Sequence, residues 1–355
     1  MDFKKILKKK IDSLKLISKK TKKLSGFMIG NTSKIEKGNF YFTPLRETSS
    51  MVVSGLIVYT EKHANIAAKY IDGKVDYILV DAEKKIRPKK NGTPSNIERR
   101  IKESVKKTKI LVYKGNDLTV DAVDIFLTNL LKKDLKGIGG KKILIIGVGN
   151  IGFKIALLMI ERGAEVFLCA RNLKNLKLKV NTLNLIKPIH TVEKVNSIKS
   201  KNLNKILKTV DIIIGATNGK AVVSKNILTK TKKEIILIDL GKGTFYHEAI
   251  NFANSESKKI YRVDISAALE GQINKLLMME NMRQDKFNKK KLLGVNIISS
   301  GLLGNYGDFV LDDVYSPKNV LGICDGKGDF LRNLNAIQKQ QLKKIKSYLK
   351  INHEN

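Results

Sequence analysis

The hexapeptide GVGNIG, residues 147–152, carries the strongest chemical signal in the sequence. It follows the apolar run KKILII and precedes IALLMIERG, which has the spacing of a helix. In a strand–turn–helix of this kind, Gly147 permits a tight turn, Gly149 lets a phosphate approach the backbone, and Gly152 lets the helix pack against the strand. The N-terminus of the helix offers free N–H groups and the positive end of its dipole. We therefore expect a dinucleotide-binding turn made by Gly147, Gly149, Asn150, Ile151 and Gly152.

The end of the next strand, AEVFLCA, indicates which dinucleotide is bound. An NAD site carries an Asp or Glu about 20 residues after the glycines, whereas an Arg at this place accommodates the 2′-phosphate of NADP. Here Arg171 stands at the strand end, Lys174 and Lys177 follow, and no acidic residue occurs from Val166 to Val180. A guanidinium can pair with a phosphate through two hydrogen bonds. We predict NADP as the cofactor, with NAD as the alternative if Arg171 is only a solvated arginine.

Two later strand ends supply further candidate cofactor-binding residues. The segments VDIIIGATNG and IILIDLGKG keep side chains small at the sheet edge where a nicotinamide ribose would pass. We therefore add Ala216, Thr217, Asn218 and Gly241 to the predicted cofactor site.

Short apolar runs alternate with helical segments on both sides of this motif. Strand-like runs begin near residues 39, 54, 75 and 108 in the N-terminal half, and near 141, 164, 210, 234 and 258 after it. This alternation predicts parallel sheets with helices on their faces. We predict an α/β fold in which a basic amphipathic helix (1–26) and an α/β substrate domain (27–125) precede a doubly wound Rossmann domain (126–275). A C-terminal segment (276–355) would close back on the cleft.

Two residues are candidates for catalysis. Asp121 could pair with a lysine as a proton-transfer couple, or could simply favour the dipole at the start of a helix. His247, just past a strand end, could donate a proton to a carbonyl or hydrogen-bond a loop. Asp312, Asp313 and Asp325 do not have the spacing of a known cation-binding loop, so turns explain them better. No Cys/His set is present, and no metal site is predicted.

Residues 116 to about 270 resemble the cofactor half of the shikimate dehydrogenase, glutamyl-tRNA reductase and methylenetetrahydrofolate dehydrogenase group. The resemblance rests on GVGNIG, CARN, DIIIGATNG and IDLG. It implies an α/β substrate domain before the Rossmann domain, and CARN is similar to the Asn-Arg-Thr-like strand end that often favours NADP there. The N-terminal half lacks the Asn-Val-Thr-x-Pro-x-Lys and Tyr-x-x-x-Lys motifs of these families, and no cysteine precedes Cys169.

The resemblance implies an NADP-dependent oxidoreductase that transfers a hydride to or from a small carbonyl or alcohol in an interdomain cleft. It identifies a superfamily and leaves the substrate open. Because the substrate-half motifs are missing, a second class of function stays open. This is a non-catalytic, regulatory or structural protein whose Rossmann domain binds a nucleotide.

The formal net charge of +35 is the outlier in the composition. It indicates either an anionic partner or a general bias toward lysine, and the spread of lysines along the whole chain favours the bias. The N-terminal segment has an apolar stripe on a lysine-rich helix, made by Phe3, Ile6, Leu7, Ile11, Leu14 and Ile17. Such a helix either packs on the protein or gives it a weak attraction to a polyanion or a membrane surface.

The remaining composition indicates a globular protein in a reducing compartment. No apolar run approaches the roughly 18 residues of a membrane span, and the N-terminus does not read as a secretory signal. Cys169 and Cys324 are the only cysteines, which suits reduced thiols. We expect a cytoplasmic protein whose partner is a small-molecule substrate. A homodimer stays open, since nothing in the sequence decides the oligomeric state.

Overall fold

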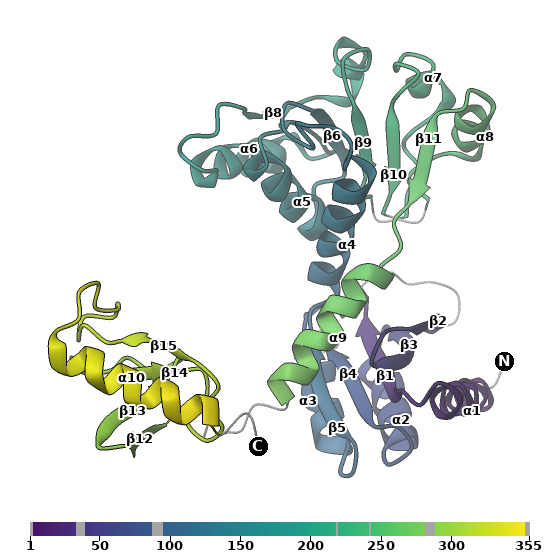
Figure 1. The fold of residues 1–355 in the computed structure, drawn as a ribbon. Helices are drawn as coiled ribbons and strands as arrows, with labels where there is room; N and C mark the ends of the chain where they lie inside the picture. Colours follow the sequence, from purple (N-terminus) through teal and green to yellow (C-terminus); the bar gives the residue numbers. More distant parts are fainter. Residues whose placement is uncertain are drawn as a thin grey trace. The chain divides into compact units, whose positions relative to one another are not determined.

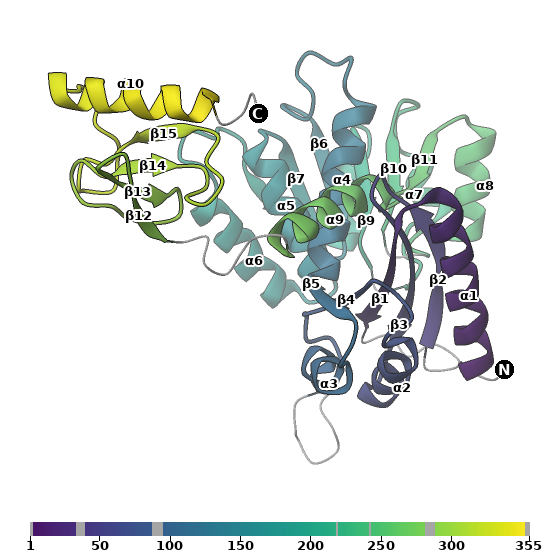
Figure 2. The same cartoon turned by 60° about the horizontal axis from the view of Figure 1, so that its bottom comes forward.

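The computed structural model of the chain describes residues 3–32, 40–86, 95–217, 219–240, 243–280 and 288–351. The chain divides into two compact units, Met1–Leu276 and Leu277–Asn355. In the described residues the first unit contains two sheets and the second contains one. Figures 1 and 2 show these elements from two directions.

The first sheet has the strand order β2-β3-β1-β4-β5. Strands β1, β3, β4 and β5 run parallel, and only β2 pairs with its neighbour in the antiparallel direction. The four parallel strands therefore end at the same edge of the sheet. The elements of this part are α1 (Phe3–Thr21), β1 (Leu24–Asn31), β2 (Phe40–Glu47), β3 (Met51–Val58), α2 (Glu61–Ile71), β4 (Tyr77–Asp81), α3 (Ile97–Ser104), β5 (Lys109–Tyr113) and α4 (Gly115–Leu130).

The second sheet is parallel throughout, with the order β11-β10-β9-β6-β7-β8. The chain turns outward in both directions from β6 and β9, which is the doubly wound Rossmann order with its switch point between these two strands. Its elements are β6 (Lys142–Ile146), α5 (Asn150–Glu161), β7 (Glu165–Cys169), α6 (Leu173–Ile186), β8 (Val195–Ser197), the 3₁₀-helix η1 (Ser200–Lys205), β9 (Ile212–Gly215), α7 (Lys225–Leu228), β10 (Ile236–Asp239), α8 (His247–Ser255), β11 (Lys259–Arg262) and α9 (Ser266–Glu280). The predicted α/β fold with a Rossmann domain is confirmed.

Both faces of the Rossmann sheet are covered. On one face, residues such as Ile143 and Ile145 pack against α4, α5 and α6, and on the other Leu144 and Ile213 pack against α7 and α8. Figure 1 shows these two helix layers on either side of the strands. Alternate residues of β6 thus belong to different cores, as a strand buried on both faces requires.

Helix α1 packs its apolar stripe on the first sheet. Leu7, Ile11 and Leu14 are buried in the same core as Phe27 of β1 and Leu56 of β3. Their spacing of three and four residues places them on one side of the helix. The helix ends at Thr21 and β1 begins at Leu24, so the end of the segment predicted as helical (1–26) lies in the central strand of the sheet.

Helices α4 and α9 run between the two sheets of the first unit. The predicted boundary at residues 125 and 126 lies inside α4, which continues to Leu130. Helix α9 returns to the turn between β2 and β3, where the Ser49 N–H donates to Glu270 Oε2 at 2.9 Å. The two helices therefore connect the Rossmann sheet to the first sheet twice along the chain.

Within residues 288–351, the second unit has a four-stranded sheet with one helix packed on it. Its order is β12-β13-β14-β15, and its elements are β12 (Lys289–Leu292), β13 (Val295–Ser299), β14 (Phe309–Leu311), β15 (Val320–Ile323) and α10 (Ala336–Ile351). Ile345 and Leu349 of α10 pack in one core with Ile297, Phe309 and Ile323 of the sheet. The idea that this segment closes on the cleft of the first unit stays a prediction.

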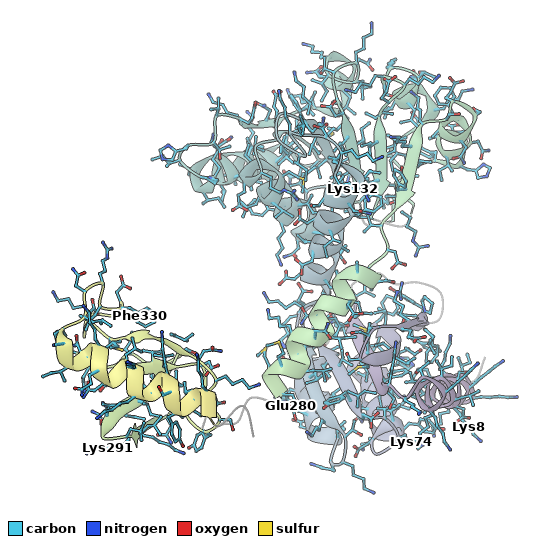
Figure 3. All side chains as sticks on the ribbon, in the orientation of Figure 1. Lys8, Lys74, Lys132, Glu280, Lys291 and Phe330 are labelled. Carbon is cyan, nitrogen blue, oxygen red and sulfur yellow. The ribbon has the colours of Figure 1, made fainter. Side chains whose placement is uncertain are left out.

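Exposed lysines are spread over both units. Lys8 on α1, Lys132 after α4 and Lys291 on β12 are all exposed, and Figure 3 labels them on three separate parts of the chain. Among the described residues, no helix is both long enough and apolar enough to cross a membrane.

We predict that α1 is an integral part of the first core. The Leu7→Ala substitution should lower the free energy of unfolding by about 2–5 kcal/mol, because it leaves a cavity at a fully buried position. Leu16→Ala on the same helix removes a side chain that is 70% exposed, and should change the free energy of unfolding by less than about 0.5 kcal/mol. Urea unfolding of the two variants measures both effects. Equal, small changes would mean that α1 does not pack on the sheet.

Candidate functional site

The glycine turn, residues 147–152, joins β6 to α5 at the switch point of the Rossmann sheet. Gly147 has a φ of +98°, a conformation that favours glycine, and a Cβ there would lie 2.7 Å from the Ala216 carbonyl carbon. A Cβ on Gly152 would lie 2.1 Å from the Gly147 carbonyl oxygen. These two glycines are therefore required by the protein's own packing.

Gly149 differs from the other two glycines. It is the N-cap of α5 with a φ of −81°, which any residue can adopt, and a Cβ built on it meets no atom within 4 Å. The protein itself therefore has room for a side chain at this position. Glycine leaves that space open directly in front of the first turn of α5, whose N–H groups have no acceptor inside the helix. The turn thus fits the pyrophosphate of a dinucleotide.

The other predicted cofactor residues surround this turn. Asn150 begins α5 and Ile151 packs partly into the core below it. Ala216 follows β9 directly, and the Thr217 hydroxyl lies 3.0 Å from the Thr244 hydroxyl. Asn218 and Gly241 lie outside the described residues.

The end of β7 lies beside the glycine turn. The Gly147 N–H donates to the Cys169 carbonyl at 2.9 Å, so the turn and the last residue of β7 are in direct contact. Arg171 follows two residues later and is exposed. Asn172 caps α6, and its Oδ1 accepts the Asn175 N–H at 3.0 Å. Arg171 and the N-terminus of α6 thus place positive charge at the strand end that, in Rossmann domains, lies next to the adenosine ribose.

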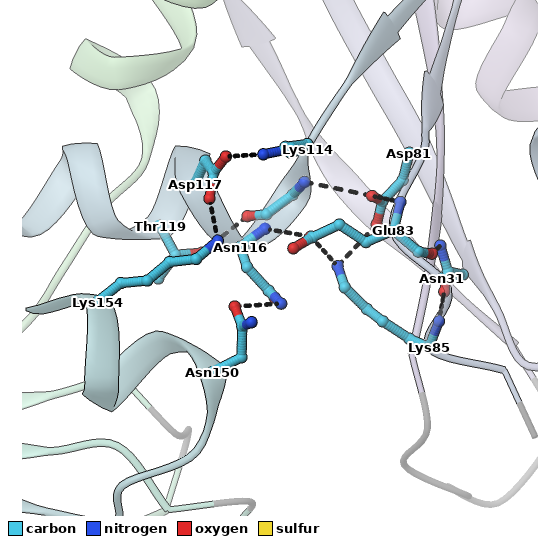
Figure 4. Close-up of polar contacts among 11 residues, drawn as sticks. Asn31, Asp81, Glu83, Lys85, Lys114, Asn116, Asp117, Thr119, Asn150 and Lys154 are labelled. Carbon is cyan, nitrogen blue, oxygen red and sulfur yellow. Dashed lines mark hydrogen bonds and ion pairs between the residues drawn. The ribbon is translucent and has the colours of Figure 1, made fainter. Parts of the chain in front are cut away.

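A second group of polar residues gathers at the carboxyl edge of the first sheet. Lys85 Nζ lies 2.8 Å from Asp81 Oδ2 and 2.8 Å from Glu83 Oε2. We call Asp81, Glu83 and Lys85 the ion cluster, and Figure 4 shows it together with its neighbours. The Asp81 side chain is 2% exposed and that of Lys85 is 20% exposed. One ammonium thus lies between two carboxylates in a largely buried position, so that the buried charges are paired.

Backbone and amide groups fix the ion cluster in place. Asp81 Oδ1 accepts the Glu83 N–H at 3.0 Å and the Gly115 N–H at 3.3 Å. Asn31, the last residue of β1, accepts the Lys85 N–H and donates to the Glu83 carbonyl. The Glu83 carboxylate in turn accepts the Asn116 N–H at 2.7 Å, so each carboxylate has a partner beyond Lys85, as buried charged groups need.

Asp81 and Lys85 of the ion cluster line a cavity of about 620 Å³ in the first unit. The C-terminal ends of β1, β4 and β5 line it, and so do Asp239 and Leu240 at the end of β10 of the Rossmann sheet. Tyr113, the last residue of β5, also lines it. Burial, and then the charges of Asp81 and Glu83, raise the pKa of Tyr113 well above its usual value. Its hydroxyl therefore stays protonated and can donate a hydrogen bond.

The first turn of α4 connects the ion cluster to the glycine turn. The Asn116 N–H donates to Glu83 Oε2 at 2.7 Å, while Asn116 Nδ2 donates to Asn150 Oδ1 at 3.1 Å. Asp117 forms ion pairs with Lys114 and with Lys154 of α5. Burial opposes ionisation of Asp117, but these ammonium groups outweigh it and lower its pKa. A chain of direct contacts thus runs from the cavity to the dinucleotide turn (Figure 4).

The two residues predicted to be catalytic do not line this cavity within the described part of the chain. Asp121 lies one turn beyond Asp117 on α4, at an exposed position. Partial desolvation, and then the charges of Asp117 and Asp124, raise its pKa. His247 is exposed at the start of α8, with Nδ1 3.3 Å from Asn251 Nδ2. Their assignment as catalytic residues stays a prediction that the geometry of the cavity does not support.

The acidic residues of the second unit bind backbone groups of their own turns. Asp312 Oδ1 accepts the N–H groups of Asp313, Lys318 and Asn319, and Asp325 Oδ1 accepts those of Lys327 and Asp329. Within the described ranges, no three His, Cys, Asp or Glu side chains are grouped closely enough to hold a metal ion.

The ion cluster was missed by reasoning from the sequence, although a signal for it exists. Asn31, Asp81 and Tyr113 are each the last residue of a strand. Parallel strands end at one edge of a sheet, so polar residues at successive strand ends gather there. This rule about strand ends identifies candidate site residues in the Rossmann sheet. In the first sheet the same rule identifies Asp81, and Lys85 follows it by four residues.

Comparison with known proteins places the Rossmann part in a group. Residues 129–265 match the family model for shikimate / quinate 5-dehydrogenase, which is less than half of the 355 residues. Glutamyl-tRNA reductase from Thermosipho melanesiensis is 27% identical over 187 residues, covering 52% of this chain and 45% of that protein. The bifunctional protein FolD from Mycoplasma capricolum is 30% identical over 128 residues, covering 36% of this chain and 34% of that protein.

Among solved structures, L-tryptophan dehydrogenase from Nostoc punctiforme is similar with a TM-score of 0.43 and 10% identity, over 74% of this chain and 76% of that one. The chain spans less than half the length of the two curated relatives named above. The predicted resemblance of the Rossmann domain to this NAD(P)-binding group is confirmed. The group implies a nicotinamide dinucleotide as the cofactor, which agrees with the open space at Gly149.

The different surroundings of two glycines predict different effects of adding a methyl group. Gly149→Ala should leave the melting temperature unchanged, because its Cβ meets nothing, but should weaken dinucleotide binding about tenfold or more, equivalent to about 1.4 kcal/mol. Gly152→Ala should destabilise the fold by about 1–3 kcal/mol through the clash with the Gly147 carbonyl. Thermal unfolding and fluorescence titration with NADPH measure the two properties separately. Unchanged NADPH affinity in Gly149→Ala would contradict a phosphate site at this turn.

Proposed function

We propose that this chain is an NADP(H)-dependent oxidoreductase that transfers a hydride to or from a small carbonyl or alcohol. One observation carries the proposal. A single cavity is lined both by the end of β10, at the carboxyl edge of the Rossmann sheet, and by Asp81 and Lys85 of the ion cluster of the first sheet. Ligands of doubly wound sheets bind at this edge. A bound nicotinamide dinucleotide supplies the hydride, and the chain must supply the proton.

Lys85 is suited to proton transfer in this cavity. An ammonium has three N–H donors, and the two carboxylates of the ion cluster accept from Lys85 at 2.8 Å. The carboxylates hold the ammonium in place, and from there it can donate a proton to a carbonyl oxygen as negative charge develops on that oxygen. In the reverse direction the same nitrogen, once neutral, accepts the proton of an alcohol. We therefore assign Lys85 as the general acid and base.

The other polar groups of the cavity orient the substrate. The protonated Tyr113 can donate a hydrogen bond to a substrate oxygen. Three basic side chains line the cavity, Arg46, Lys85 and Arg262, and three acidic ones balance them, Asp81, Asp239 and Asp264. Arg46 and Asp264 also pair with each other at 3.6 Å. The strong positive charge of the chain therefore does not extend to this cavity, which suits a small polar substrate.

The proposed preference for NADP over NAD rests on Arg171. This exposed guanidinium follows β7, and no acidic residue between Val166 and Val180 would repel a 2′-phosphate. Titration with NADPH and NADH, followed by assays of NADP reduction with a panel of hydroxy acids and polyols, tests the proposal. Saturable binding without turnover of any of them would favour a nucleotide-binding regulatory or structural protein instead.

We predict that Arg171 distinguishes the two cofactors. Arg171→Gln should raise the Kd for NADPH about tenfold or more, since a charge-assisted hydrogen bond is worth about 1.5–3 kcal/mol. The Kd for NADH should stay within about twofold, because NADH has no 2′-phosphate for the guanidinium to bind. Fluorescence titration of both dinucleotides measures this ratio. Tighter binding of NADH than of NADPH by the unsubstituted chain would contradict the assignment.

We predict that Lys85→Arg separates charge from proton transfer. Arginine keeps the positive charge between Asp81 and Glu83 but does not give up a proton in proteins. Turnover should fall about 10²–10⁴-fold, the usual contribution of a general acid or base, while NADPH binding is kept. The best substrate from the panel serves for the assay. A variant with unchanged turnover would show that Lys85 only stabilises the fold.

A further inference from the structure

Lys179 contacts the glycine turn from the neighbouring helix. It lies in the second turn of α6, is half-buried, and its ammonium donates to the Val148 carbonyl. Val148 stands between the first two glycines of the turn. A positive charge is therefore held against the backbone that is expected to carry the phosphates of a dinucleotide.

The first half of the glycine turn faces the adenosine side of the site. The Gly147 N–H binds the Cys169 carbonyl, which ends β7, and Arg171 follows Cys169 by two residues. The residue after this strand recognises the adenosine ribose at its 2′-position. Because Val148 directly follows Gly147, the Lys179 ammonium lies on the side of the turn where the 2′-substituent is expected.

The local charge around Lys179 is one-sided. Residues 166–192 contain five basic side chains, those of Arg171, Lys174, Lys177, Lys179 and Lys187, and no acidic one. In the whole chain the ratio of basic to acidic residues is 68 to 33, so a segment of this length would be expected to contain some acids. Lys174 and Lys177 are exposed, whereas Lys179 is held in place by its contact with the turn.

Other lysines that bind carbonyls have a different arrangement. Lys187, at the end of α6, donates to the carbonyls of both Thr191 and Glu193, and Lys258 donates to those of Thr231 and Lys232. Each of them thus joins two backbone groups. Within the described residues the only hydrogen bond from Lys179 goes to Val148, and an ammonium has three donors. Two donors of Lys179 are therefore left for a ligand.

We propose that Lys179 is a second cation of the 2′-phosphate site. Its ammonium pairs with the 2′-phosphate of NADP(H) from the side of the glycine turn, while Arg171 pairs with it from the end of β7. This inference rests on the proposed NADP(H)-dependent function and extends it, because it adds a specificity-determining residue on another element. The Val148 carbonyl positions the ammonium before the cofactor arrives, so less side-chain freedom is lost on binding.

The test compares Lys179→Gln with Lys187→Gln. Lys187 is the C-cap residue of the same helix and also donates to backbone carbonyls, but it lies at the opposite end of the helix from the cofactor site. Fluorescence titration with NADPH and NADH gives two dissociation constants for each variant. We expect Lys179→Gln to raise the Kd for NADPH about tenfold, as loss of a charge-assisted hydrogen bond does, and to leave the Kd for NADH within about twofold. Lys187→Gln should change neither constant.

Lys179→Arg separates a charge effect from a folding defect. It keeps a cation that can bind phosphate and should keep most of the preference for NADPH. Equal losses of NADPH and NADH affinity in Lys179→Gln, or no loss of either, would overturn the inference and leave Lys179 as a support of the turn. If the unsubstituted chain bound NADPH and Lys179→Gln left the Kd for NADPH unchanged, only this inference would fail. If the unsubstituted chain bound neither dinucleotide, the proposed function would fail with it.

Discussion

The first turn of α4 is bonded on two sides, and the proposed site depends on this arrangement. On one side the Asn116 N–H binds Glu83, and the Gly115 N–H binds Asp81. On the other side the Asn116 side chain binds Asn150, and Asp117 pairs with Lys154. The N-terminus of α4 favours the negative charges placed around it. The same turn therefore fixes the ion cluster and anchors the start of α5, where the dinucleotide is expected.

The two halves of the proposed site are arranged in the same way, at the carboxyl ends of parallel strands. In both sheets, residues at the carboxyl ends of the parallel strands face one edge, and a helix begins there. In the Rossmann sheet this edge carries the glycine turn, Ala216 and Asp239, and in the first sheet it carries Asn31, Asp81 and Tyr113. A cavity that both edges line can hold a hydride carrier and a proton donor together. Neither sheet contains both parts by itself.

The sequence predicted the Rossmann fold and its glycine turn because their signals are local, whereas the roles of the site residues stay predictions. Gly147, Gly149 and Gly152 lie within six residues, and their roles follow from the turn that those residues form. Arg171 lies one strand further on, in a position set by the length of α5 and β7. The α/β class followed from the alternation of apolar runs. These features depend on short segments whose structure is decided by neighbouring residues.

The ion cluster could not be found in the same way, because it depends on how distant segments pair. Asn31 reaches Lys85 only because β1 and β4 are neighbours in the sheet. The start of β1 falls within the segment that was predicted as a lysine-rich helix, so no strand was predicted there. The two glycines of β1, Gly26 and Gly30, also weaken its strand pattern. Asp121 drew attention as an acid near the start of a helix, but α4 begins at Gly115, so Asp117 occupies the first turn. The role proposed for Lys179 could not be predicted either, because it depends on the contact of α6 with the glycine turn.

The central claim is that the dinucleotide and Lys85 share one cavity. Trace acetylation followed by mass spectrometry measures how fast Lys85 reacts, with the exposed Lys132 as an internal reference. Saturating NADPH should slow the acetylation of Lys85 relative to Lys132, because the nicotinamide end would shield the cavity. The fragment 2′,5′-ADP, which lacks that end, should bind without protecting Lys85. If NADPH binds saturably and the relative rate at Lys85 stays the same, the cofactor and the ion cluster do not share a site.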